Sequence, residues 1–252
     1  TAEQGTGTQE SPDEASPLRS CGGLQGGEKR PSGRAGIVGE SGREKQAEKM
    51  IVQKIHRHFP AHNILAEEGT KGNEQSEYCW IIDPLDGTTN FTHGLPIFCV
   101  SIGLQKNGET ICGVVYDPNR DELFSAEKNA GAFQNGKKIS VSSTDTLIRS
   151  LLVTGFPYNI TENPDNCIEH FVNFLMQGQA VRRLGSAALD LCYVANGRFD
   201  GFWEVFLNPW DMAAGALLVE EAGGTVTHFN GAQHSIFGKN ILASNGKVHQ
   251  QM

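Results

Sequence analysis

The chain has 252 residues, 38% of them hydrophobic and 20% charged, which is typical of a globular protein with an ample core. Its net charge of −8 argues against a general nucleic-acid binder, which would normally show a basic face. No apolar run approaches the roughly 18 residues that a membrane span needs, and no signal-peptide pattern is visible at the N-terminus. We therefore expect a cytoplasmic protein with no nucleic-acid or membrane partner.

The N-terminal segment differs in composition from the rest of the chain. Residues 1–44 hold ten glycines and no aromatic residue. Such a segment cannot bury enough apolar surface to offset its ordering entropy. We predict that residues 1–38 are disordered or atypical and that residues 39–252 form a single domain with two parts, 39–148 and 149–252.

The first part of that domain reads as one helix followed mainly by strands. Apolar spacing marks the helix, and alternating side chains mark the strands. Two Asn/Gly turns predict hairpins, one at Asn129-Ala130-Gly131 and one at Asn135-Gly136. In chain order, the predicted elements are a helix from Glu44 to near Phe59-Pro60, strands at 64–66, 79–82, 97–104 and 111–116, and hairpins over 121–142.

The second part alternates strands and helices, and glycines close two of its helices. This order, after a strand-rich first half, predicts layered α/β sheets. The predicted strands are 151–154, 180–184, 201–205, 225–229 and 241–243, and the predicted helices are 167–176, 186–196 and 210–222.

The most informative stretch is Trp80–Phe91, which reads WIIDPLDGTTNF. We expect its apolar strand to stop at Asp83-Pro84, because proline removes a backbone donor. Asp86-Gly87 marks a second sharp turn. The two carboxylates therefore leave the end of a strand close together, which is costly unless a cation or a proton lies between them. Both aspartates are also common turn formers.

The residues that follow these aspartates, Gly87-Thr88-Thr89-Asn90, look like the start of a helix. Backbone N–H groups without intrahelical partners would attract a phosphate there. A cation site next to a phosphate site indicates metal-assisted phosphoryl chemistry.

Two further motifs lie elsewhere in the chain. One is Ala66-Glu67-Glu68, and the other runs from Trp210-Asp211-Met212-Ala213-Ala214-Gly215 to Glu221-Ala222-Gly223-Gly224. Together with the first motif, they resemble the signatures of the inositol monophosphatases, which are magnesium-dependent phosphomonoesterases. The resemblance runs from about Glu48 to the C-terminus, and the segment from Arg182 to Glu204 looks closer to the bacterial branch of the family.

This resemblance implies a fold and an activity. The expected fold is the five-layered αβαβα sandwich shared with fructose-1,6-bisphosphatase, here with the metal ligands mainly in residues 39–148 and the site completed by residues 149–252. The implied substrate is a small phosphorylated polyol, inositol 1-phosphate, hydrolysed by a metal-activated water. Two or three Mg²⁺ ions, sensitivity to Li⁺ and a homodimer are also implied.

The resemblance also assigns metal ligands. Asp83 would bridge two ions, Glu67 and the carbonyl of Leu85 would bind the first, and Asp86 and Asp211 the second. An all-oxygen set favours Mg²⁺ over Zn²⁺, because no His or Cys clusters with it. Asp211 would in addition be a favourable acid in the first turn of a helix.

Catalytic and substrate-binding roles follow in the same way. Glu67 and Thr88 would hold the attacking water as a general-base pair next to Asp83. Without the resemblance, Glu67 reads as a solvated strand end and Glu204 as an exposed strand carboxylate. The expected substrate-binding residues are Asp86, Gly87 and Thr88 near the phosphate, and Gly185, Ser186, Ala187 and Glu204 near the alcohol.

The N-terminal metal element of the family, Thr-x-x-Asp, is not recognisable here. One alignment places Glu44 at its aspartate and Ser41 at its threonine, and another places Gly42 there. By the first alignment, Glu44 would support a third, weaker metal ion.

Two other functions stay open. Sister phosphatases that share the three motifs act on fructose 1,6-bisphosphate, adenosine 3′,5′-bisphosphate, NADP or histidinol phosphate. A regulatory or binding homologue with impaired catalysis is the alternative from a different class, and the altered N-terminal element favours it.

Overall fold

Two β-sheets organise the part of the chain that the computed structural model describes, residues 40–69 and 76–252. The prediction for residues 1–38 lies outside these residues. The first sheet is mostly antiparallel, and only its first two strands run parallel. In sheet order its strands are β1 (Asn63–Ala66), β2 (Tyr78–Asp86), β3 (Cys99–Lys106), β4 (Glu109–Asp117), β5 (Glu122–Glu127), β6 (Gly131–Gln134) and β7 (Lys137–Lys138).

The second sheet is mixed, with parallel pairing of β10 with β8 and of β8 with β9. The strand predictions for 151–154 and 201–205 are confirmed residue for residue. In sheet order its strands are β11 (Thr225–Thr227), β12 (Asn240–Ser244), β10 (Gly201–Val205), β8 (Leu151–Thr154) and β9 (Ala180–Arg182).

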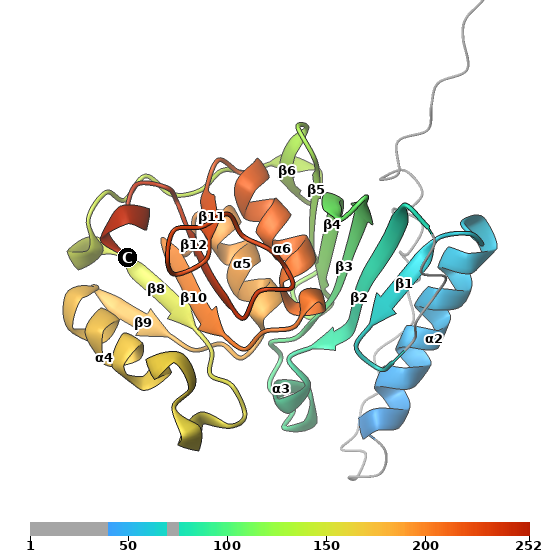
Figure 1. Ribbon diagram of the computed structural model, residues 1–252, viewed down its shortest axis with the longest axis horizontal. Helices are drawn as coiled ribbons and strands as arrows, with labels where there is room; N and C mark the ends of the chain where they lie inside the picture. Colours follow the sequence, from blue (N-terminus) through green and yellow to red (C-terminus); the bar gives the residue numbers. More distant parts are fainter. Residues whose placement is uncertain (1–39, 70–75) are drawn as a thin grey trace, which may run out of the picture. The chain divides into compact units, whose positions relative to one another are not determined.

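Helices cover and separate the two sheets (Figure 1). The helices α5 (Ala187–Ala195) and α6 (Pro209–Glu221) lie between the sheets and contact both, while α2 (Glu40–His58) packs on the first sheet and α4 (Cys167–Gln177) on the second. The layers therefore run α, β, α, β, α, which confirms the predicted sandwich. Shorter pieces are α3 (Thr88–Thr92) and single turns of 3-10 helix at Leu147–Arg149, Ile160–Glu162, Pro164–Asn166 and His249–Gln251.

The two central helices explain why the core sits between the sheets. All nine residues of α5 are buried, and so is the run from Met212 to Val219 in α6. Small residues let α6 approach the first sheet closely, since a Cβ added at Gly113 of β4 would lie 2.9 Å from the backbone of Ala214. None of the helices in the described residues combines the length and the apolar character that a bilayer crossing requires.

The prediction that the second strand ends at Asp83-Pro84 is wrong, because β2 continues to Asp86. Its pairing with β3 shifts register between Asp83 and Asp86, so Pro84 falls in an irregularity where no ladder donor is needed. Its other neighbour, β1, already ends opposite Ile82. The strand therefore accommodates proline and carries both aspartates on its final residues.

Candidate active site

Four acidic side chains from three places in the fold line one cavity of about 230 Å³. Because β1 and β2 are parallel, the carboxyl end of β1 delivers Glu67 next to the end of β2, and the N–H of Glu67 donates to the carbonyl of Ile82 at 3.2 Å. Asp83 and Asp86 come from β2 itself. Asp211 comes from the first turn of α6, more than a hundred residues later.

Asp83 is the most tightly enclosed of these acids on the first sheet. Its side chain is buried, and its Oδ1 accepts the N–H of Leu85 at 2.8 Å. Burial and the charges of Asp86, Glu67 and Asp211 raise the pKa of Asp83 well above its usual range. A buried acid surrounded by acids is a group for which a cation would replace repulsion by attraction.

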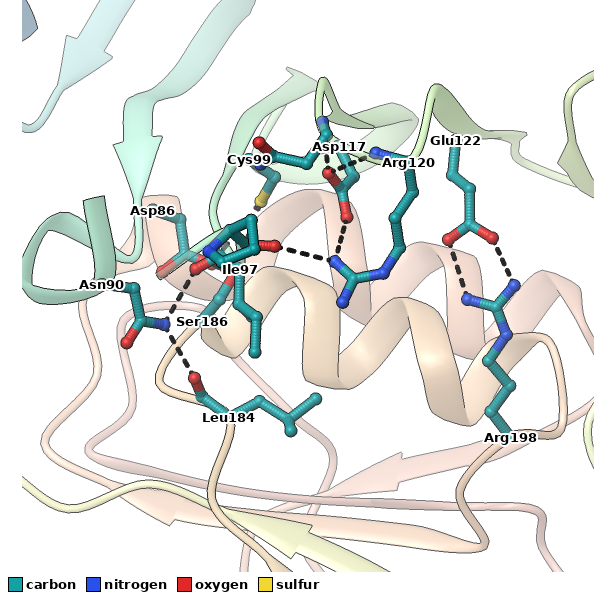
Figure 2. A network of polar contacts seen from close by, with 12 residues as sticks. Asp86, Asn90, Ile97, Cys99, Asp117, Arg120, Glu122, Leu184, Ser186 and Arg198 are labelled. Carbon is teal, nitrogen blue, oxygen red and sulfur yellow. Dashed lines mark hydrogen bonds and ion pairs between the residues drawn. The ribbon is translucent and has the colours of Figure 1, made fainter. Parts of the chain in front are cut away.

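Asp86 is held in one orientation by the start of α5 (Figure 2). Its Oδ2 accepts the hydroxyl of Ser186 at 2.6 Å and the N–H of Ala188 at 2.8 Å, with the thiol of Cys99 at 3.7 Å. Burial raises the pKa of Asp86, and these donors, with the N–H of Ala187, oppose that shift. The N–H groups at this helix start therefore donate to a carboxylate of the first sheet. All three of these contacts involve Oδ2 of Asp86.

Gly87 and Thr88 form the turn into α3. Gly87 has φ +95°, and a Cβ there would lie 2.9 Å from the carbonyl oxygen of Ile97, so both the backbone angle and the space require glycine. The hydroxyl of Thr88 donates to the carbonyl of Leu85 at 3.1 Å. The carbonyl expected to bind a metal and the hydroxyl expected to hold a water thus lie next to each other on the cavity wall.

Asp211 has two roles that are compatible. Its Oδ2 accepts the N–H of Asn208 at 2.7 Å, which completes a capping box at the start of α6. Burial and the charge of Asp86 raise the pKa of Asp211 to about 7, while the N–H of Asn208 opposes the shift. The cap fixes the side chain while it still lines the cavity.

The residues fit hydrated Mg²⁺ better than a tightly caged ion. Within residues 40–69 and 76–252, no three acidic, histidine or cysteine side chains are placed to share one metal ion. Glu67, Asp83, Asp86, Asp211 and Leu85 line the cavity without forming such a cluster. Mg²⁺ keeps several waters and binds through one or two carboxylates, so this oxygen-only set suits it.

The far wall of the cavity carries a second acidic pair, Glu204 from β10 and Asp190 from α5. Both are buried. Burial, with the charges of Asp211 and Asp86, raises the pKa of Glu204 to about 8, opposed by Arg183 and the N–H of Gly155.

Glu204, which the resemblance assigns to the substrate, lines this cavity, and so do Gly185, Ser186 and Ala187. The prediction missed Asp190. The signal was present, because Asp190 is the single charged residue in the run AALDLCYVA.

Glu44 lies near the acids of the first sheet. It is buried on α2, and its charge contributes to the raised pKa of Glu67, for which loss of hydration is the largest cause. Gly42, the alternative position in the alignment, is exposed. The neighbouring Glu48, also on α2, accepts the N–H of Glu68 at 2.8 Å and so ties the end of β1 to the helix.

Asn90 links the segment before β3 to the segment before α5 (Figure 2). Its amide nitrogen donates to the carbonyl of Ile97 at 2.8 Å and to that of Leu184 at 2.7 Å. From the sequence, Asn90 is predicted only to lie at a helix start. Its partner Leu184 lies 94 positions away, so the contact exists only in the folded chain.

Comparison with known proteins agrees with this geometry. Residues 42–252 match the model of the inositol monophosphatase family. The chain belongs to that family. An inositol-1-monophosphatase of Synechocystis sp. is 50% identical over 222 residues, covering 87% of this chain and 77% of the relative. A Pseudomonas aeruginosa protein named Nus factor SuhB is 46% identical over 214 residues, covering 83% and 79%.

Solved structures of the family share the fold. An inositol monophosphatase from Anabaena (Nostoc) sp. PCC 7120 has a TM-score of 0.81 and 50% identity, and the match covers 84% of each chain. An IMPase of Thermotoga maritima has a TM-score of 0.77 and 41% identity, covering 87% of this chain and 83% of that one. The family is one of metal-dependent phosphatases, and this member has the corresponding layered fold.

Proposed function

We propose that this protein is a Mg²⁺-dependent phosphomonoesterase that hydrolyses inositol 1-phosphate to inositol and phosphate. The observation that carries the proposal is the convergence of Glu67, Asp83, Asp86 and Asp211 on one cavity, where burial and the charges of the other three acids raise the pKa of Asp83. A relative that is 50% identical to this chain and is named inositol-1-monophosphatase supports the substrate class.

In this proposal, residues on one wall of the cavity bind the phosphate, and residues on the other wall bind the alcohol. Gly87 and Thr88 offer backbone N–H groups to the phosphate, and Glu204 accepts or donates a hydrogen bond to a hydroxyl of the alcohol. Glu67 takes the proton of the attacking water, which the hydroxyl of Thr88 orients. Mg²⁺ ions, one held by Glu67, Asp83 and the Leu85 carbonyl and another by Asp86 and Asp211, would neutralise developing charge and lower the pKa of that water. Glu44 would support a further ion.

We also infer that water, rather than a thiol of the protein, attacks the phosphate. The thiol nearest to the acids, Cys99, is buried, and burial and the charge of Asp86 raise its pKa well above its usual range. A thiol of that kind is a poor nucleophile at neutral pH.

A phosphate-release panel tests the proposal. The substrates are inositol 1-phosphate, fructose 1,6-bisphosphate, adenosine 3′,5′-bisphosphate, NADP and histidinol phosphate, each with Mg²⁺ and after exhaustive chelation. We expect the highest kcat/KM for inositol 1-phosphate, loss of activity in chelator and recovery on Mg²⁺ addition, with inhibition by Li⁺. Preference for another substrate would assign a sister activity, and full activity without metal would contradict the metal site.

The name of the Pseudomonas relative gives a second candidate, a regulatory role as a Nus factor. The presence of Glu67, Asp83, Asp86 and Asp211 in one cavity argues for catalysis, whereas the altered N-terminal element favours the regulatory role. No phosphate release from any member of the panel, by a folded protein in Mg²⁺, would favour the regulatory role.

We also propose a homodimer. An apolar face of α4 supports it, since Ile168, Val172, Leu175 and Met176 recur at helical spacing and are all exposed. Light scattering should give the mass of two chains, and a Val172→Glu variant should give the mass of one.

A further inference from the structure

Asp190 is an acid in a place where acids are rarely found. It lies in the middle of α5, all nine residues of which are buried, and its own side chain is 1% exposed. A carboxyl group in such an environment is costly unless a hydrogen-bond donor or a cation offsets the lost hydration. Natural proteins therefore rarely keep one without a reason.

Nothing in the described part of the chain offsets this cost. The Oδ1 atom of Asp190 is buried and has no hydrogen-bond partner there. The charged groups that act on Asp190 are Glu204 and Asp86, both acids. The N–H groups at the start of α5 do not serve it, because those of Ala187 and Ala188 are directed to Asp86. A ligand bound in the cavity can supply the missing hydrogen-bond partner.

The cavity identifies where that partner lies. Asp190 lines the same cavity as the acids of the first sheet, and on its far wall it accompanies Glu204. We propose that Asp190 is a specificity-determining residue whose Oδ1 binds a hydroxyl group in the alcohol part of the substrate, beside the hydroxyl bound by Glu204. This inference rests on the proposed function.

The chemistry restricts the substrate class. A hydroxyl group can donate to a carboxylate and can accept from a carboxylic acid, so Asp190 can bind it in either protonation state. Two carboxyl groups on one wall require an alcohol with at least two hydroxyl groups besides the esterified one. A phosphate ester without such hydroxyls leaves Asp190 and Glu204 unpaired, and sites of this kind reject analogues that lack the matching group. The class is therefore a phosphorylated polyol.

The test compares Asp190→Ala with the wild-type enzyme on two substrates, inositol 1-phosphate and 4-nitrophenyl phosphate, in saturating Mg²⁺. We expect kcat/KM for inositol 1-phosphate to fall about 10- to 100-fold, the effect of one hydrogen bond to a carboxylate, mainly through KM. 4-Nitrophenyl phosphate has no hydroxyl for Asp190, so its kcat/KM should stay nearly unchanged. Cys192→Ala is the control for removing a buried side chain from α5, because Cys192 lies on the same helix but does not line the cavity.

A series of mono-deoxy inositol 1-phosphates sharpens the test. The analogue that lacks the hydroxyl bound by Asp190 should react equally well with the wild-type enzyme and with Asp190→Ala, whereas the others should distinguish them. Should Asp190→Ala not fold, Asp190→Asn keeps the volume and one acceptor oxygen, and it should show a smaller loss on inositol 1-phosphate alone.

Two results would overturn the inference, and they differ from each other. Equal losses on both substrates, in Asp190→Ala or in Asp190→Asn, would make Asp190 a structural residue while leaving the proposed function intact. A wild-type enzyme with no preference for inositol 1-phosphate over 4-nitrophenyl phosphate would remove the proposed function together with the role of Asp190.

Discussion

Buried aspartates of this protein differ in what compensates their burial. Asp117, at the end of β4, accepts the N–H groups of Asn119 and Arg120 and forms an ion pair with the Arg120 guanidinium at 2.8 Å (Figure 2). Asp83 accepts the N–H of Leu85 and otherwise faces other acids. The first carboxylate stabilises the fold, whereas the second is held in place by the fold at a cost in stability.

We therefore expect opposite effects from two matched substitutions. Asp83→Asn should reduce kcat at least about 10²- to 10³-fold, the effect of losing one electrostatic stabiliser. The unfolding free energy of the metal-free protein should not fall, and relief of repulsion should raise it. Asp117→Asn, which weakens a satisfied pair outside the cavity, should lower the unfolding free energy by about 1–3 kcal/mol. Kinetics in Mg²⁺ and denaturant unfolding in chelator measure these effects.

Near-normal turnover of Asp83→Asn would show that Asp83 only shapes the turn at the end of β2. A loss of stability as large as that of Asp117→Asn would show that Asp83 has a stabilising partner that this account omits.

At the scale of elements, the position of α6 on the first sheet decides where Asp211 lies. Gly103 and Gly113, on the neighbouring strands β3 and β4, face α6, and a Cβ at either would come within 2.9 Å of it. The helix begins at the cavity with Asp211 and runs across the strands from β2 to β6. Any displacement of α6 therefore moves Asp211 relative to the acids of β2.

We predict that Gly113→Ala impairs both stability and catalysis. The added methyl group meets the backbone of Ala214, which cannot yield without moving α6, and overpacking of this kind costs about 1–3 kcal/mol. The Mg²⁺ concentration for half-maximal kcat should rise as Asp211 shifts. Gly42→Ala, in the exposed part of α2 with no atom within 4 Å of the added Cβ, is the matched control and should gain up to about 1 kcal/mol from helix propensity.

A Gly113→Ala protein with wild-type Mg²⁺ dependence would contradict the link between the position of α6 on the first sheet and the proposed metal site. This holds even if the unfolding free energy of the variant falls.

At the scale of the whole molecule, the acidic cavity brings together parts of the chain that belong to different sheets. Asp83 and Asp86 end a strand of the first sheet, Glu204 lies in the second, and Asp211 starts a helix between them. The carboxylates repel one another across these layers. Their raised pKa values mean that the folded protein takes up protons more readily than the unfolded chain.

Stability without metal should therefore fall as pH rises. Asp211 has a folded pKa of about 7 against about 3.9 in an unfolded chain, so its favourable contribution is complete below the lower value and is lost as pH passes the higher one. Asp83 and Glu204 act in the same direction. We expect a lower unfolding free energy at pH 8 than at pH 6 in chelator, and a smaller difference in Mg²⁺, which binds the folded form.

Denaturant unfolding at the two pH values, with chelator and with Mg²⁺, measures this effect. Asp211→Asn should reduce the pH dependence in chelator. A metal-free protein that is equally stable at both pH values would contradict the assigned repulsion.

Much of the fold could be predicted because local patterns agreed with the tertiary arrangement. The strands at 151–154 and 201–205 and the turns at Asn129 and Asn135 follow from residue type and period, and both asparagines have positive φ as expected. Asp83, Asp86 and Asp211 could be named from motifs whose spacing is specific. Local rules failed at Pro84, because whether proline ends a strand depends on which neighbouring strands are still present.

The sequence by itself identified Asp83, Asp86 and Asp211 as candidate site residues, since acids beside glycine and proline turns are visible without coordinates. Only the tertiary structure decided which acids meet, what holds each one and which lack a partner. Asn90 bonds Leu184, Asp86 bonds the start of α5, and Asp190 lies beside Glu204 in the cavity lining. The reason is that burial and electrostatic interaction depend on distance in space, and packing between the two sheets sets those distances.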